Sequence, residues 1–231
     1  IIEEVSETFF GELHWMRLSV QPVHNAYGIV TGALLNAVDI SDRKRAEIMH
    51  EKSEIRLRGL LAIDEALLSN RPIVEIAAQA LDHMRLLIPY NHALVGTFEQ
   101  DGLTIQCITA RAENSEYRIE PDNRFVLPQH VRSLIAGMPY LLIDDLHAYN
   151  DPIFDFLYTR GIRAMLCVGL KHDDRMFGLM VLYSTSTNSF TFDDIQCALE
   201  IARQMAVAIH TMMLDHQIRQ HAAVLEERVK E

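Results

Sequence analysis

The stretch SDRKRAEIMHEKSEIRLRGLLAIDEALL, residues 41–68, has no proline and a single glycine, and it predicts one long helix. Ser41 is a favourable N-cap residue, and Asp42 places a negative charge in the first turn, where the helix dipole stabilises it. Apolar residues become denser toward the C-terminal end of the stretch. Because an isolated helix gains little stability by itself, we expect this one to pack on a second copy, on the following domain, or on both.

The composition around this helix is that of an ordinary globular protein, with 231 residues of which 49% are hydrophobic and 23% charged. The formal net charge of −11 argues against binding to nucleic acid or to anionic membrane surfaces. Uninterrupted apolar runs, such as residues 177–183, are much shorter than the roughly 20 residues of a membrane span. Three widely spaced cysteines, Cys107, Cys167 and Cys197, are typical of reduced thiols in a cytoplasmic protein. We expect the chain to be part of a longer protein.

Upstream of the helix, residues 3–10, 13–23 and 29–40 alternate apolar with polar side chains and predict three strands. Turn-forming residues at 11–12 and 25–28 separate them, so the strands should form an antiparallel sheet. Such a sheet needs a cover on its apolar face, and the only nearby helix is the one that follows.

The stretches HWMRLSVQPV, residues 14–23, and YGIVTGALLNAVDISDRKRAE, residues 27–47, resemble the C-terminal half of a PAS domain. The closing Asp-Ile-Thr of that family corresponds here to Asp39-Ile40-Ser41, followed by a charged helix start. The resemblance implies that residues 1–41 are a C-terminal PAS fragment. A PAS ligand pocket would lie mostly upstream of these residues.

Downstream of the helix, the sequence predicts a second sheet. Apolar residues at helical spacing between 73 and 88 predict another helix, and strands are predicted at 93–99, 103–110, 140–143, 163–170 and 176–184. Short helices are predicted at 128–136 and after Asp151, where Pro152 follows an N-cap residue and Gly161 ends the helix.

Two of these strands, 163–170 and 176–184, are apolar on both faces, so the sheet should be covered on both sides. We expect the long helices to form one cover and the irregular segment 111–160 to form the other. A loop-rich cover over a sheet is where a small-molecule pocket would form.

The last helix has a clear start signal, because Thr191 and Asp194 are spaced as a capping box and Phe190 and Ile195 as a hydrophobic staple. Further along, apolar residues at heptad spacing predict a short coiled coil. These positions are Ile218, Ala222, Leu225 and Val229.

Residues 59–212 resemble a GAF domain, most clearly over LIDDLH (142–147), GIRAMLCVGL (161–170), FGLMVLYS (177–184) and FTFDDI (190–195). The resemblance implies an α+β fold in which a six-stranded antiparallel sheet has helices on one face and a loop-rich pocket on the other. The three-stranded PAS fragment and the long linker helices complete the expected architecture.

We divide the chain into a PAS fragment at 1–41, a signalling linker helix at 42–58, a GAF domain at 59–212 and a coiled-coil output linker at 213–231. This order resembles the sensor region of a bacterial histidine kinase. It implies a noncatalytic, cytoplasmic sensory segment that forms a homodimer through helices 41–68 and 192–231. The segment would relay a small-molecule or partner signal to a downstream kinase domain, and any kinase activity would lie there.

The lid and strand positions named as candidate ligand contacts come from the pocket that the GAF resemblance implies. They are Phe98, Cys107, Leu142, Asp144, Phe154, Tyr158, Arg163, Met165, Cys167 and Tyr183. We assign no catalytic residue and no metal ligand.

The identity of any cofactor is left open by the sequence. Phytochrome-type GAF domains attach a bilin to a cysteine near the pocket lid, and residues 111–160 contain no cysteine, so we expect no covalent bilin. Haem and iron are not expected either, because candidate ligands lack tight spacing. These candidates are His92, His130, His147, Asp144, Asp145 and Asp155.

Two alternatives remain open. The GAF unit could be a ligand-free dimerisation spacer whose pocket is filled by its own side chains, or it could be a redox sensor with haem or iron. The side chains that would fill the pocket are Phe125, Phe154, Phe156 and Tyr158.

Overall fold

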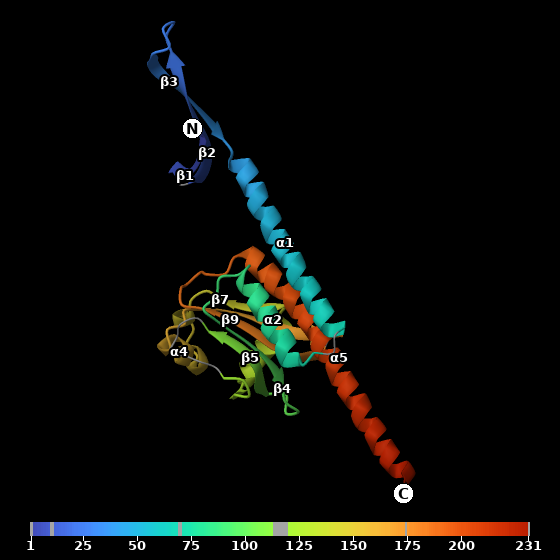
Figure 1. The fold of residues 1–231 in the computed structure, drawn as a ribbon. Helices are drawn as coiled ribbons and strands as arrows, with labels where there is room; N and C mark the ends of the chain where they lie inside the picture. The colour runs from blue at the N-terminus through green and yellow to red at the C-terminus, as the bar shows by residue number, and fades with distance from the viewer. Residues whose placement is uncertain (1, 10–11, 69–70, 113–119, 174, 231) are drawn as a thin grey trace. The chain divides into compact units, whose positions relative to one another are not determined.

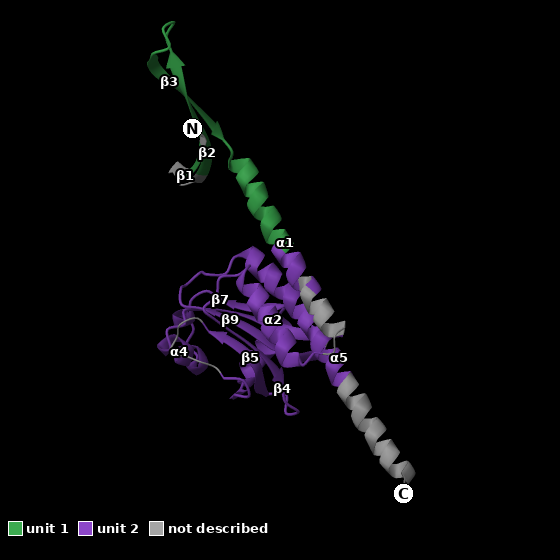
Figure 2. Ribbon diagram, viewed as in Figure 1, with its two compact units in different colours: residues 1–54 green, residues 55–231 purple. Residues whose placement is uncertain are grey.

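The computed structural model describes residues 2–9, 12–68, 71–112, 120–173 and 175–230, with side chains of the last helix described as far as Leu214. The chain divides into two compact units, residues 1–54 and 55–231 (Figure 2), and each has its own sheet. None of the helices in the described part of the chain combines the length and apolar character that crossing a bilayer requires.

The first unit contains the predicted three-stranded antiparallel sheet, in the order β1-β2-β3. Its elements are β1 (Ile2–Phe9), β2 (Glu12–His24), β3 (Val30–Asp39) and the beginning of α1 (Ser41–Leu68). The turn between β2 and β3 forms at Asn25, whose Oδ1 accepts hydrogen bonds from the N–H groups of Tyr27 and Ile29. All of β3 is exposed to solvent.

The first turn of α1 differs from the sequence prediction. The carbonyl of Ile40 accepts the N–H of Lys44 at 2.9 Å, so Ile40 and not Ser41 is the N-cap residue. The Ser41 hydroxyl instead accepts the N–H of Trp15 at 2.8 Å, which ties the helix to β2. Asp39 accepts the N–H of Ser41 at 2.8 Å, and hydrogen bonds from Ser41 lower the pKa of Asp39 to about 2.

A cluster of charges around Glu4 joins β1 and β2 to the same helix turn. One Glu4 carboxylate oxygen lies 3.1 Å from the Arg17 guanidinium and 2.7 Å from that of Arg43, and the other lies 2.8 Å from Lys44 Nζ. Hydrogen bonds from Lys44 and Arg17 lower the pKa of Glu4 to about 2. The sheet and the helix start are therefore held together by polar contacts at their shared end.

The second unit is built on one antiparallel sheet with strand order β6-β5-β4-β9-β8-β7, as predicted for the GAF-type fold. Its elements are α2 (Ile73–Arg85), β4 (His92–Phe98), β5 (Thr104–Ala112), β6 (Arg124–Val126), α3 (Gln129–Gly137), β7 (Tyr140–Ile143), the 3-10 helix η1 (Leu146–Ala148), α4 (Pro152–Thr159), β8 (Ala164–His172), β9 (Arg175–Ser184) and α5 (Phe192–Lys230). The mixed α+β fold class is confirmed.

The two faces of this sheet carry separate apolar cores, as the strand pattern predicted. We call the side covered by α2 and α5 the helix face, and the side covered by α3, η1 and α4 the lid face (Figure 1). In β8, Leu166 and Val168 are buried on the helix face, while Met165 and Cys167 between them are buried on the lid face. Each central strand thus connects the two cores.

The central strands β4 and β9 approach closely at a pair of glycines. A Cβ atom on Gly178 would lie 2.0 Å from the carbonyl oxygen of Gly96, so no larger residue fits there without moving a strand. The β4–β5 register shifts between Val95 and Gly96, which marks a bulge at the same place.

The predicted start of α5 is confirmed by its capping box. The N–H of Thr191 donates to Asp194 Oδ2 at 2.8 Å, and the N–H of Asp194 donates back to Thr191 Oγ1 at 3.3 Å. Phe190 and Ile195 are both buried in the helix-face core. The predicted heptad residues of the coiled coil, Ile218 to Val229, lie outside the described side chains.

Candidate functional site

The lid face encloses an apolar cavity of about 370 Å³, which we call the lid-face cavity. Its floor includes Leu94, Ile105, Met165, Cys167, Val181 and Tyr183, from four strands of the sheet. Its cover includes Phe125, Val131, Ile135, Ile153, Phe154 and Phe156, from β6, α3 and α4. A mostly apolar chamber of this size falls within the range of small-molecule sites in proteins.

The two helices of the lid are joined at the N-terminus of α4. The Asp151 side chain accepts the N–H of Ile153 at 2.9 Å, which confirms the predicted cap. Its other carboxylate oxygen lies 2.5 Å from Nε2 of His130 in α3. One carboxylate therefore both starts α4 and connects it to α3.

Lys171 fixes the other end of α3 to the sheet. Its Nζ donates to the carbonyl of Ile135 at 3.2 Å and to those of Ala136 and Met138 at 2.9 Å. These carbonyls lie at or just past the C-terminus of α3, where a positive charge also complements the helix dipole. The lid is consequently attached to β8 by a charged side chain.

The C-terminus of α4 is held by a stack of side chains. The Arg163 guanidinium lies 4.0 Å from the Tyr158 ring centroid, and its Nη1 donates to the Tyr158 carbonyl at 2.9 Å. The His147 ring stacks on the same tyrosine, with ring centroids 4.8 Å apart. Gly161 stops the helix with a φ of 85°, a conformation that favours glycine. Arg163 and Tyr158, predicted as ligand contacts, thus position the lid.

Four of the ten predicted ligand residues line the lid-face cavity: Phe154, Met165, Cys167 and Tyr183. Three more, Phe98, Cys107 and Tyr158, belong to the lid-face core or pack against it without lining that cavity. Arg163 acts from the end of α4, as described above.

The remaining two predicted residues lie elsewhere. Leu142 pairs with Leu166 across β7 and β8, and cross-strand partners share a face, so Leu142 packs on the helix face. Asp144 is exposed, and its carbonyl accepts the N–H of Asn188 at 3.0 Å. Neither residue lines the lid-face cavity, and the ligand contacts as a set stay a prediction.

The ten predicted contacts did not include Leu94 and Ile105 on the floor or Val131 in the cover, and Phe125 was expected only as a side chain that could fill the pocket. The alternation in β5 includes Ile105, but β4 is buried over its first five residues and has no alternation that would single out Leu94. Phe125 lies in β6, a three-residue strand that the sequence did not predict.

The cavity and its surroundings offer little chemical reactivity. Burial raises the pKa of the Cys167 thiol to about 12 and that of Cys107 to about 11, so both are neutral near pH 7 and poor nucleophiles. Burial also lowers the pKa of His92. Within the described residues, no three His, Cys, Asp or Glu side chains are grouped closely enough to hold a metal ion.

Comparisons with known proteins agree with this geometry. The family model described as GAF domain matches residues 58–209. A search of curated protein sequences found no significant match. Among solved structures, the phycoerythrobilin-bound GAF domain from a cyanobacterial phytochrome aligns with a TM-score of 0.62 and 17% identity, over 70% of this chain and 97% of that one.

Two further structures show the same fold. The phycocyanobilin-bound GAF domain from a cyanobacterial phytochrome aligns with a TM-score of 0.62 and 18% identity, over 70% of this chain and 97% of that one. The chromophore-binding domain of the bacteriophytochrome RpBphP3 from R. palustris aligns with a TM-score of 0.61 and 12% identity, over 93% of this chain and 75% of that one.

These comparisons correct the cofactor expectation. The sequence argument set bilins aside because residues 111–160 lack a cysteine, whereas the GAF structures to which this chain is similar are bound to phycoerythrobilin and phycocyanobilin. The lack of a cysteine in this one segment was too narrow a criterion, because it tests only covalent attachment of a bilin at that place. It does not test whether the cavity can hold a bilin.

Proposed function

Because this chain belongs to the GAF domain family, with residues 58–209 matching the family model, we propose that it senses a small molecule bound in the lid-face cavity. The segment acts without catalysis of its own, and the bound molecule changes how α5 packs on the sheet. The observation that carries this proposal is the apolar cavity of about 370 Å³ between the lid and the sheet.

The ligand-free spacer is the alternative, and the cavity distinguishes the two. Phe125, Phe154 and Phe156 all border the cavity and still leave it open, and Tyr158 packs nearby without lining it. Aromatic side chains that surround a space of this size favour a flat, mostly apolar ligand. Since the similar phytochrome domains hold bilins, linear tetrapyrroles belong in the first set of ligands to test.

We further infer that the segment belongs to a larger signalling protein. The β1-β2-β3 sheet followed directly by α1 supports assigning residues 1–41 to a PAS fragment. A dimer formed through α1 and α5 would then pass the signal to a kinase domain. Phosphate incorporation from labelled ATP by the full-length protein, with and without the ligand, tests the kinase assignment.

The experiment for the cavity is native mass spectrometry of freshly purified protein, followed by thermal unfolding with added biliverdin and smaller aromatic compounds. The variant Ile153→Trp should fill the cavity from the lid, where α4 can adjust to the added volume. Leu134→Trp is the matched control, since Leu134 is exposed on α3 of the same lid and does not line the cavity.

A retained molecule, or a rise in Tm with one of these compounds, that disappears in Ile153→Trp and persists in Leu134→Trp supports ligand sensing. If the purified protein carries no added mass and no compound changes its Tm, the ligand-free spacer becomes the favoured function and ligand sensing is rejected.

A further inference from the structure

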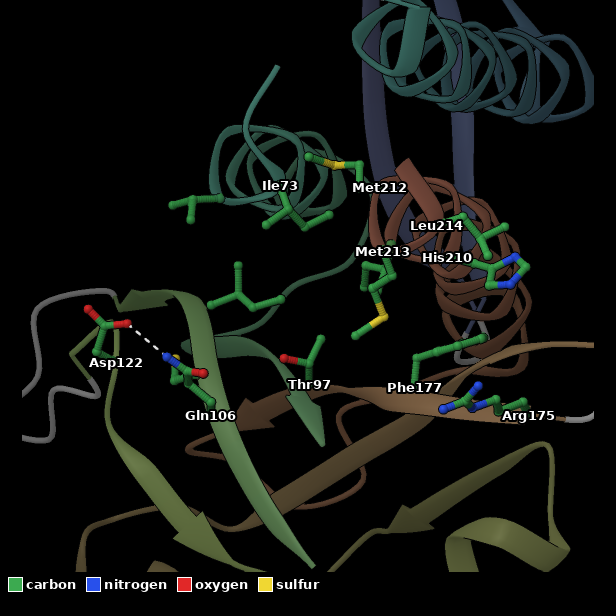
Figure 3. Close-up of a pocket in the computed structure, with 14 residues that line it drawn as sticks. Ile73, Thr97, Gln106, Asp122, Arg175, Phe177, His210, Met212, Met213 and Leu214 are labelled. Atoms are coloured by element: carbon green, nitrogen blue, oxygen red, sulfur yellow. Dashed lines mark hydrogen bonds between the residues drawn. The ribbon is translucent and has the colours of Figure 1, made fainter. Parts of the chain in front are cut away.

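A second cavity, of about 760 Å³, lies on the helix face (Figure 3). It is bordered by the beginning of α2, by α5 around residues 209–214, and by the ends of β4, β5 and β9. The sheet separates it from the lid-face cavity. We call it the helix-face cavity.

One end of the helix-face cavity brings Arg175 and His210 together around the ring of Phe177. The Arg175 guanidinium lies 5.3 Å from the Phe177 ring centroid, and the His210 ring lies 5.1 Å from the same ring. The His172 ring is 4.8 Å from that of His210. Among the described residues, the exposed Asp173 lies 3.5 Å from His172.

Within the described residues, no carboxylate forms an ion pair with Arg175. Arg175 lines the cavity, so a carboxylate that enters it can contact this guanidinium.

The opposite end has the reverse character. Gln106 Nε2 donates to Asp122 Oδ1 at 3.2 Å, and Thr97 lies between this pair and Phe177 (Figure 3). An anionic group is repelled by Asp122 and attracted by Arg175, so the cavity orients it toward Phe177. The upper wall is apolar, formed by side chains such as Ile73 and Met212.

We propose that the helix-face cavity binds a flat apolar monocarboxylic acid. Its carboxylate lies between Arg175 and His210, and its ring packs against Phe177 and Met212. One guanidinium and one imidazole suit a single negative charge, and the guanidinium geometry matches a carboxylate. Residues between Ile209 and Leu214 form one wall of the cavity, so a bound molecule contacts α5 directly. This contact lies at the end of the part of α5 that packs in the helix-face core. This second input does not depend on the proposed ligand of the lid-face cavity.

The test is calorimetric titration of the whole chain with 2-naphthoate, with uncharged 2-naphthamide as the matched compound. Arg175→Gln should weaken naphthoate binding on the order of tenfold, because a hydrogen bond to a charged group is lost, and should leave naphthamide unchanged. Arg85→Gln is the control variant, since the Arg85 guanidinium also lies over a ring, 5.7 Å from Tyr90, and borders neither cavity. It should bind naphthoate as the unmodified protein does.

Hydrogen exchange then locates the bound compound. Naphthoate should slow amide exchange at 175–178 and 209–214, whereas a lid-face ligand should slow it at 129–137 and 152–159. The proposal is overturned if Arg175→Gln and Arg85→Gln bind naphthoate alike, if no binding is detected at millimolar naphthoate, or if protection falls on the lid segments. Protection on the lid segments would place naphthoate in the lid-face cavity, whereas the other two results say nothing about that cavity's ligand.

Discussion

At the scale of single residues, the sheet of the second unit depends on the absence of a side chain at Gly178. Replacing it with alanine places a Cβ atom 2.0 Å from the Gly96 carbonyl oxygen, so β4 and β9 must separate. We expect Gly178→Ala to lower the free energy of unfolding by about 2–4 kcal/mol in a chemical denaturation experiment. Gly137→Ala is the control, because no atom lies within 4 Å of its added Cβ, and it should change stability by less than about 1 kcal/mol. If Gly178→Ala and Gly137→Ala lowered stability equally, the close contact at Gly178 would not be the cause.

Lys171 provides a second test at this scale, because one ammonium group joins the lid to the sheet. Lys171→Met removes all three hydrogen bonds to carbonyls at the end of α3 and keeps most of the apolar stem. Amide exchange across residues 129–137 should become faster by a factor of about ten, with a loss of about 1–2 kcal/mol in local stability. Lys171→Arg should recover part of the protection. Unchanged exchange in Lys171→Met would show that packing alone holds α3.

At the scale of elements, the sequence predicted most helices and strands because their signals are local. The capping box of Thr191 and Asp194 gave the beginning of α5, and Asp151 gave that of α4. The sequence did not predict β6, because three residues show no alternation and the strand is defined only by its pairing with β5.

The candidate site was predicted less completely, since it depends on which face of a strand each residue occupies. The run Tyr140-Leu141-Leu142-Ile143 is apolar throughout, so nothing in it distinguishes the faces. Only the pairing of Leu142 with Leu166 places it on the helix face. The prediction of Ser41 as the N-cap was also wrong because of a contact between residues distant in sequence. The Ser41 hydroxyl accepts a hydrogen bond from the N–H of Trp15.

The ion pair between α2 and β5 gives a prediction for pH. Arg111 donates to both carboxylate oxygens of Asp82, at 2.6 and 2.9 Å, and this lowers the pKa of Asp82. Because the pKa is lower in the folded state than in the unfolded one, the stabilisation is present above about pH 4 and is lost as the pH falls further.

Asp82→Asn should therefore cost about 0.5 kcal/mol near pH 7, a small value because the Asp82 side chain is 58% exposed, and almost nothing near pH 2. Denaturant titrations between about pH 2 and pH 7 measure this cost. Arg111→Gln should remove the same pH-dependent part of the stability. A cost that stays constant with pH would contradict the role of the charge.

At the scale of the whole molecule, the second unit connects its two cores through shared strands. Met165 and Cys167 in β8 form part of the cavity floor, while Leu166 and Val168 contact the helix-face core that contains α5. Because protein interiors are close-packed, a ligand that displaces the floor must also displace the other face. A lid-face ligand should thus alter amide exchange in α5 at residues 195–209, measured with and without the bound compound. If amide exchange changes only in α3 and α4, the ligand binds without affecting α5, and the prediction is contradicted.

The described part of α1 also carries an apolar surface that the chain itself leaves exposed. Leu57 and Leu61 lie one turn apart and are 58% and 52% exposed, while Gly59 between them is buried beside His83 of α2. A helix with one side packed and an exposed apolar pair on another is best stabilised by a second copy of itself. We expect sedimentation velocity at tens of micromolar to show a dimer, and Leu57→Glu with Leu61→Glu to shift it toward monomer. Leu134→Glu is the control, because Leu134 is 43% exposed on α3, which covers the opposite face of the sheet. If the double variant is still a dimer, the dimer contact does not involve Leu57 and Leu61. If the unmodified protein is a monomer, the proposed signalling through a dimer is contradicted.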